Sequence, residues 1–157
     1  MKEQMILAAT DGSEVSENAV RYAGEIAKTM GVKLVLFHVC EHEKGGYWPF
    51  IERHLTREME QATERIEKRV TGMLDSMGVS HEMEHKAQKD APHVEIVDYL
   101  EAHSDVLAVV MGERGSGLRG HRSMGSTTEK VIHEISARGL PVPVVVVPSA
   151  GYRKKAA

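Results

Sequence analysis

Glycine, hydroxyl and basic residues are concentrated in one segment, residues 112–127, which follows an apolar run. Glycines let the main chain approach a ligand closely and turn its amides toward it. Gly125, Ser126 and Thr127 precede an amphipathic stretch, where the N–H groups that open a helix favour an anion. Basic donors stand nearby at Arg114, Arg119, His121 and Arg122. This chemistry suits a phosphate, and a Gly-rich loop before an ordinary capped helix is the alternative.

A second candidate segment, Thr10-Asp11-Gly12-Ser13, follows the first apolar run. The carboxylate of Asp11 would suit a ribose hydroxyl, or a metal ion that bridges phosphates. The two candidate segments must come together if they are to form one site. Their meeting depends on the elements that precede them.

Five short segments have the character of strands. Four of them are rich in β-branched residues and largely apolar at both odd and even positions, namely residues 6–9, 32–39, 106–111 and 142–147. This pattern is typical of parallel strands covered on both faces. Residues 79–87 alternate between His or Met and charged side chains, which favours an edge or half-exposed strand.

The segments between these runs have helical periodicity. The second is the clearest, with one apolar stripe made of Ile51, Leu55, Met59, Ala62, Ile66, Val70, Met73 and Met77. Gly31 is predicted to end the first helix in a left-handed cap, Gly78 to end the second helix, and Arg138-Gly139 to close the fourth.

Two helix starts are also predicted. The third helix begins near Asp90, with Pro92 in its first turn. The fourth opens at Ser126 as the N-cap residue, and Glu129 completes a capping box.

This alternation predicts an α/β fold with one doubly wound open sheet of five mainly parallel strands and four helices. Such sheets bind ligands beyond the carboxyl ends of their strands, where the winding reverses. If the first and fourth strands flank that point, the two candidate segments form one crevice. We expect one domain over residues 1–150 and a short basic tail over residues 151–157.

The chain resembles the nucleotide-binding universal stress proteins. Gly112-x-x-Gly115, nine further residues and Gly125-Ser126 reproduce the pattern G-x2-G-x9-G-[ST]. The Ala-Thr-Asp-Gly-Ser segment, Phe37-His38-Val39 and the Val-rich last strand are also similar to that family. The resemblance implies a fold like that of the adenine-nucleotide α-hydrolases, with strand order 3-2-1-4-5.

The resemblance also implies ATP, or AMP or ADP, in the crevice, and it allows a Mg²⁺ or Mn²⁺ ion at Asp11. Val39 and Met111 would pack on the base, Gly112 and Gly115 would accommodate the sugar and phosphate, and residues 125–127 would hold the phosphates. Together with the loop chemistry, this places around the nucleotide Thr10, Asp11, Val39, Met111, Gly112, Arg114, Gly115, Gly125, Ser126 and Thr127.

Composition excludes several classes of protein. A net charge of −3 and a pI near 6.3 argue against a nucleic-acid binder driven by bulk charge. No apolar run approaches the ~18 residues that cross a bilayer. The single cysteine, Cys40, excludes an internal disulfide and fits a reducing compartment. We therefore expect a cytoplasmic protein that contacts neither nucleic acid nor membrane.

Two other motif matches are rejected on their context. Residues 81–85 match H-E-x-x-H, but zinc proteases need both histidines on one helical face, and this segment has strand character. Gly115-x-Gly117-x-x-Gly120 matches the dinucleotide fingerprint, but it follows the fourth strand and does not open a helix directly.

The last strand segment, residues 142–147, is strongly apolar and flanked by prolines, which confines it to an edge. Because an exposed valine edge invites pairing, we expect a homodimer through this strand. The leading functional hypothesis is an ATP-binding stress-response module with at most slow hydrolysis, since no Walker lysine-serine pair is present. The alternatives are a dimeric stress protein that acts without nucleotide and an adenylating or ATP-hydrolysing enzyme.

Overall fold

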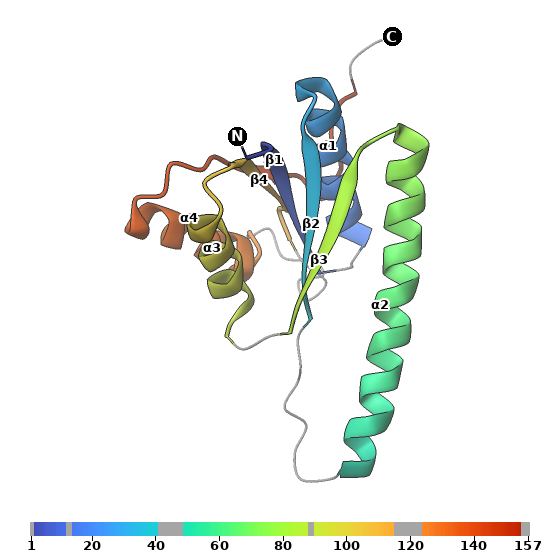
Figure 1. Ribbon diagram of the computed structural model, residues 1–157. Coiled ribbons are helices and arrows are strands. Elements are labelled where there is room, and N and C mark those ends of the chain that lie inside the picture. Colours follow the sequence, from blue (N-terminus) through green and yellow to red (C-terminus); the bar gives the residue numbers. More distant parts are fainter. Residues whose placement is uncertain (1, 12–13, 41–48, 88–89, 115–123, 155–157) are drawn as a thin grey trace.

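The computed structural model describes residues 2–11, 14–40, 49–87, 90–114 and 124–154 (Figure 1). Strands and helices alternate along the chain, as the sequence predicts. The elements are β1 (Met5–Thr10), α1 (Glu14–Met30), β2 (Lys33–Cys40), α2 (Pro49–Met77), β3 (His81–Ala87), α3 (Pro92–Ala102), β4 (Val106–Gly112), α4 (Ser126–Arg138) and β5 (Val144–Val147).

The five strands form one sheet in the order β3-β2-β1-β4-β5, and every neighbouring pair is parallel. From β1 in the middle, the chain winds outward through β2 to β3. It then crosses back to β4 on the other side of β1 and continues outward to β5. The winding therefore reverses between β1 and β4, and the predicted doubly wound fold with its strand order is confirmed.

Alternate residues of the strands supply two separate cores. Leu7 faces a cluster with Val131 and Ile135 of α4 and several residues of α3, while Ile6 and Ala8 face a cluster with α1 and α2. Figure 1 shows α3 and α4 together on one side of the sheet and α2 on the other. Both faces of the central strands are thus covered, which explains why their sequences are apolar on both parities.

Helix α2 is the longest element, at 29 residues, and its first turns extend past the carboxyl ends of the strands (Figure 1). Its carboxyl half packs on the sheet through the buried side chains of Val70 and Leu74, with Ile66, Met73 and Met77 beside them. This part of the predicted apolar stripe is confirmed as core. None of the described helices is both long and apolar enough to cross a membrane.

The two edge strands match their sequence patterns. Residues 81–85 lie in β3, an edge strand, so the H-E-x-x-H segment is extended and not helical. Strand β5 is the other edge, but it covers only Val144–Val147 and not residues 142–147. Pro143 lacks an N–H group, and it joins the sheet only by accepting a hydrogen bond from Val109 N to its carbonyl oxygen (3.0 Å).

The predicted helix ends are confirmed at Gly31, Gly78 and Gly139, whose φ angles are 68°, 70° and 64°. Helix α3 begins at Pro92, two residues after the predicted Asp90. A left-handed backbone is costly for residues that carry a Cβ atom, so glycine ends these helices at little cost.

Ion pairs fasten α4 to α3 on their outer side. The Nη1 atom of Arg138 lies 2.7 Å from Asp98 and 2.8 Å from Glu101 of α3, and its Nε lies 3.2 Å from Glu134. The hydrogen bonds that Arg138 donates to these carboxylates, first to Asp98 and then to Glu101, raise its pKa. Together with Val131 in the core, these contacts fix the position of α4, whose amino end matters below.

A matched pair of glycine substitutions tests this account of the helix ends. Gly72 lies inside α2 and Gly31 follows α1, and a Cβ atom built at either position meets nothing within 4 Å. We expect Gly72→Ala to raise the free energy of unfolding by about 0.5–1 kcal/mol, because alanine is the better helix former. We expect Gly31→Ala to lower it by about 1 kcal/mol, because its φ is +68°. Urea unfolding followed by circular dichroism measures both, and equal effects of the two variants would contradict the assignment.

Candidate functional site

The carboxyl ends of β1 and β4 lie side by side. Ala8 of β1 is in register with Val110 of β4, and two residues further along the strands are Thr10 and Gly112. Neighbouring strands are about 4.8 Å apart, so the chain leaves the sheet at two adjacent points. Asp11 follows Thr10 and is exposed. The two segments that the sequence marks for phosphate and sugar chemistry thus start from the same place, at the reversal of the winding.

The end of β1 is joined to the first turn of α1. The hydroxyl oxygens of Thr10 and the buried Ser16 lie 2.9 Å apart, within hydrogen-bond distance. This contact sets the direction in which the chain leaves β1. Gly12 and Ser13, which belong to the same predicted segment, lie outside the described residues.

The chain after β4 returns to its starting point through two hydrogen bonds. The amide of Gly125 donates to the carbonyl oxygen of Glu113 (2.7 Å), and the hydroxyl of the buried Thr128 donates to the carbonyl oxygen of Gly112 (2.8 Å). We call these two bonds the neck, since they join the ends of residues 114–124. Residues 115–123, with the predicted Gly115, Arg119, His121 and Arg122, lie outside the described residues.

The start of α4 differs from the sequence prediction. The N-cap residue is Gly125, with φ −61° and ψ 142°, and no side chain caps the helix. The predicted role of Ser126 as N-cap of a capping box is therefore wrong, because Ser126 is already the first helical residue. The neck explains why the helix begins one residue earlier than predicted. The amide of Gly125 donates to Glu113, and the carbonyl oxygen of Gly125 accepts the first hydrogen bond of the helix, from Glu129 N (3.0 Å).

The amides that open α4 are oriented for an anion. Ser126, Thr127 and Thr128 occupy the first three helical positions, where an N–H group has no carbonyl partner within the helix. The dipole of α4 adds partial positive charge at the same point. This arrangement fits a phosphate on main-chain donors, as the residue types at 125–127 predict.

The structure brings most of the predicted site residues to one end of the sheet. Met111, the penultimate residue of β4, is buried at 4% exposure in the α3–α4 core. Arg114, just beyond β4, is partly buried, and its Nε is a buried donor without a hydrogen-bond partner. Val39 lies at the carboxyl end of β2, one residue beyond His38, which is in register with Thr10.

Glu113 is a residue that the sequence analysis did not single out. Its carboxylate accepts hydrogen bonds from the backbone amide and the hydroxyl of Ser149, both at 3.1 Å. The backbone bond, followed by the side-chain bond, lowers the pKa of Glu113. Glu113 stands at a variable position of the glycine pattern, and Ser149 is 36 residues away, so no local spacing signal links them.

The described residues give limited support for a metal ion. No group of three His, Cys, Asp or Glu side chains that could hold a metal is found among them. The ion predicted at Asp11 thus has no preformed set of three such ligands among the described residues.

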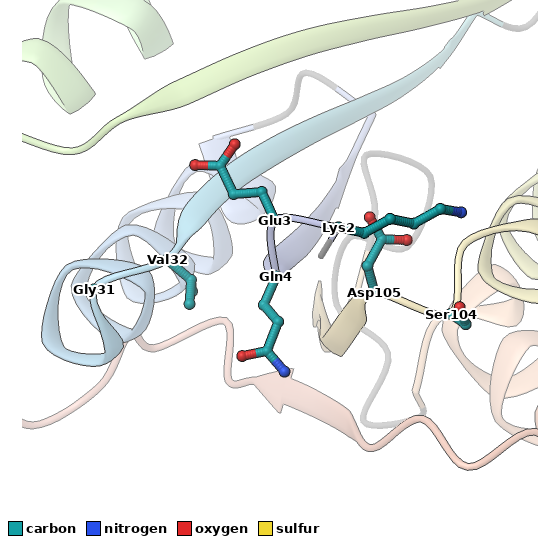
Figure 2. A pocket seen from close by; sticks show the side chains of 7 residues that line it. All are labelled: Lys2, Glu3, Gln4, Gly31, Val32, Ser104 and Asp105. Atoms are coloured by element: carbon teal, nitrogen blue, oxygen red, sulfur yellow. The ribbon is translucent and has the colours of Figure 1, made fainter.

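A pocket of about 640 Å³ lies at the other end of the sheet (Figure 2). Its lining comes from residues that precede β1, β2 and β4, namely Lys2, Glu3, Gln4, Gly31, Val32, Ser104 and Asp105. It is thus separated from the candidate site by the length of the strands. None of the residues predicted for nucleotide binding lines it.

Comparison with known proteins agrees with this fold. The sequence model of the Universal stress protein family matches residues 4–148, and the chain belongs to this family. A universal stress protein of Mycolicibacterium smegmatis is 29% identical over 92% of the chain, which spans about half of that relative's length (48%). Universal stress protein MJ0531 of Methanocaldococcus jannaschii is 29% identical over 90% of this chain and 80% of its own.

Solved structures share the fold over most of their length. UspA of Lactobacillus plantarum superimposes with a TM-score of 0.71 at 19% identity, covering 93% of this chain and 98% of that one. A universal stress protein in complex with cAMP gives 0.60 at 22% identity, with 95% and 99% covered. The Archaeoglobus fulgidus protein in complex with dAMP gives 0.62 at 20% identity, with 92% and 97% covered.

The neck provides a stability test. Thr128→Val keeps the shape of the side chain but removes the donor to Gly112 O, so a partly buried carbonyl loses this partner. We expect the free energy of unfolding to fall by about 1–2 kcal/mol in urea titrations. The matched control is Thr29→Val, whose exposed hydroxyl donates to Glu25 O within α1 and should change stability by less than about 0.5 kcal/mol. Equal stability of Thr128→Val and the wild type would show that the bond contributes nothing to the fold.

Proposed function

We propose that this chain binds ATP at the carboxyl ends of β1 and β4 and acts as a nucleotide-dependent stress-response module in the cytoplasm. The observation that carries the proposal is the position of the amino end of α4. The neck holds its three outward amides beside the end of β4, and β1 delivers Asp11 next to the same point. One crevice can therefore offer main-chain donors to phosphates and a carboxylate to the sugar or to a bound ion.

The residues at this end of the sheet suggest which group would contact each part of the nucleotide. Ser126 and Thr127 would hold phosphates through their amides, and Arg114, with its unpaired Nε, would add a cationic donor. Asp11 would face the ribose hydroxyls or a Mg²⁺ or Mn²⁺ ion on the phosphates. Val39, Met111 and Gly112 would line the base and sugar, together with Gly115.

The family relationship favours an adenine nucleotide. Two of the structures that share the fold are complexes with cAMP and with dAMP, which both carry an adenine base and a phosphate. In keeping with the site, we assign the chain a binding role, with any ATP hydrolysis slow. The sequence contains no Gly-x4-Gly-Lys-Ser/Thr segment of the kind that holds the β- and γ-phosphates in many nucleotide hydrolases.

Nucleotide binding is tested by calorimetry with ATP, AMP and GTP. We expect ATP to bind to the full chain, and mass spectrometry of freshly purified protein to detect a retained adenine nucleotide. Gly125→Val places a branched side chain at the neck beside the phosphate-facing amides. Because hydrogen bonds to a charged phosphate are strong, we expect ATP affinity to fall roughly a hundredfold or more.

The control for this substitution is Gly72→Val, which makes the same change at an exposed position of α2. Circular dichroism should show both variants folded. Unchanged ATP affinity in Gly125→Val would show that the neck is not part of the nucleotide-binding site. A wild-type chain that binds no adenine nucleotide would refute the proposed function.

We also propose that the chain forms a homodimer through β5. This strand is an edge of the sheet, and Val144, Val145 and Val146 remain partly exposed on it. An apolar edge with unpaired N–H and C=O groups is a template for pairing with a second copy.

Sedimentation equilibrium at micromolar concentration should therefore detect a dimer. We expect Val146→Lys to shift the chain to monomer, because a charge on the edge strand opposes pairing. Ile132→Lys, which charges an exposed apolar position of α4, should leave the dimer intact. A wild-type protein that is only monomeric under these conditions would contradict the pairing.

A further inference from the structure

Glu113 joins three parts of the chain that are far apart in sequence. Its amide donates to the carbonyl oxygen of Val147 at the end of β5 (2.8 Å), and its own carbonyl oxygen accepts from Gly125 at the start of α4 (2.7 Å). Its carboxylate receives the amide and the hydroxyl of Ser149, in the segment after β5. A single residue thus connects the ends of β4 and β5 to the helix that presents the candidate phosphate donors.

These contacts hold both the backbone and the side chain of Glu113. The backbone bond to Val147 extends the pairing of β4 with β5, in which Gly112 is in register with Val147. The carboxylate bonds hold the side chain, and with it the Cα atom of Glu113, against Ser149, while the bond from Gly125 holds the peptide between Glu113 and Arg114. Since the carbonyl oxygen of that peptide accepts from Gly125, its orientation sets the orientation of the N-cap residue of α4.

A carboxylate at this position is otherwise unfavourable for the proposed ligand. Glu113 brings a negative charge to the edge of a site proposed to hold phosphates, and like charges there would weaken binding. The hydrogen bonds from Ser149 lower the pKa of Glu113, which favours its charged form. A residue that is electrostatically costly but structurally well connected points to a positioning role.

We propose that the Glu113–Ser149 contact is a latch that holds the amino end of α4 in its phosphate-binding orientation. The latch uses the segment after β5 to preset the main-chain donors before a ligand arrives, and this preorganisation lowers the cost of binding. Glu113 is a positioning residue here and does not itself contact the nucleotide. The inference rests on the proposed nucleotide function and adds to it the residues that set affinity.

The latch has a readout that needs no nucleotide. In Glu113→Ala the carboxylate bonds to Ser149 are lost, while the backbone bonds remain possible. We expect the amides of Gly125 and Glu129, which donate to the carbonyl oxygens of Glu113 and Gly125, to exchange with deuterium about tenfold faster in the ligand-free protein, because the hydrogen bonds that hold the side chain of Glu113 are gone. Glu113→Gln keeps an acceptor for Ser149 and should restore most of the protection. Unchanged exchange in Glu113→Ala would overturn the latch whatever the chain binds.

Calorimetry then separates positioning from simple charge. We expect Glu113→Ala to bind ATP about tenfold more weakly and adenosine, which has no phosphate, nearly as well as the wild type. If Glu113 were only a negative charge near the phosphates, its removal would tighten ATP binding, so the two roles predict opposite signs. Glu64→Ala, which removes a negative charge from an exposed position of α2, is the control and should change neither affinity.

A second variant keeps the test valid if Glu113→Ala is poorly folded. Ser149→Ala removes only the hydroxyl donor, and we expect about threefold weaker ATP binding. The double variant should bind ATP no more weakly than Glu113→Ala alone, because both changes break the same contact. Wild-type ATP binding with unchanged affinity in all of these variants would refute the latch and leave the proposed function standing. A wild type without ATP binding would refute the proposed function, and the exchange measurement alone would then decide the latch.

Discussion

The parallel pairing of β1 with β4 is the constraint on which the rest of the structure depends. These two strands are adjacent in the sheet although β2 and β3 lie between them in the sequence. Because the chain winds away from this pair in opposite directions, α1 and α4 are placed on opposite faces, and the space beyond the strand ends is left to the loops. Any pairing that inserted another strand between β1 and β4 would separate Asp11 from the amino end of α4. The position of the candidate site therefore depends first on the strand order and only then on the side chains.

The site itself is built mainly from the backbone. Gly112, Glu113 and Gly125 act through carbonyl and amide groups, and Thr128 supports them with a hydroxyl. Main-chain donors are fixed by the fold and carry no charge of their own, so their value to an anion depends on how rigidly they are held. The contacts of Arg138 with α3 and of Gly125 with the carbonyl oxygen of Glu113 restrain opposite ends of the same helix. Rigidity, more than the number of charges, distinguishes this site from a merely basic surface.

The sequence predicted the order and type of every element, because both faces of the central strands are buried and the helices carry clear apolar stripes. The ends marked by Gly31, Gly78 and Gly139 were predictable since a left-handed cap has one preferred residue. Ser126 was misplaced because a serine three residues before a glutamate is a strong local signal, while the bond from Gly125 to Glu113 is set by tertiary structure. Ser149 could not be linked to Glu113 at all, since contacts between distant residues leave no periodic trace in one chain.

The closed neck has a consequence for how the segment between its two ends can vary. Once Glu113 and Gly125 are joined, the fold is indifferent to how many residues lie between them, since doubling the length of a loop costs only about 0.6 kcal/mol in closure entropy. Insertions or deletions there would leave the sheet and both cores intact. A fixed spacing of nine residues between Gly115 and Gly125 is therefore not a requirement of folding. Such a length restriction, wherever selection maintains it, would reflect the proposed ligand and not the fold.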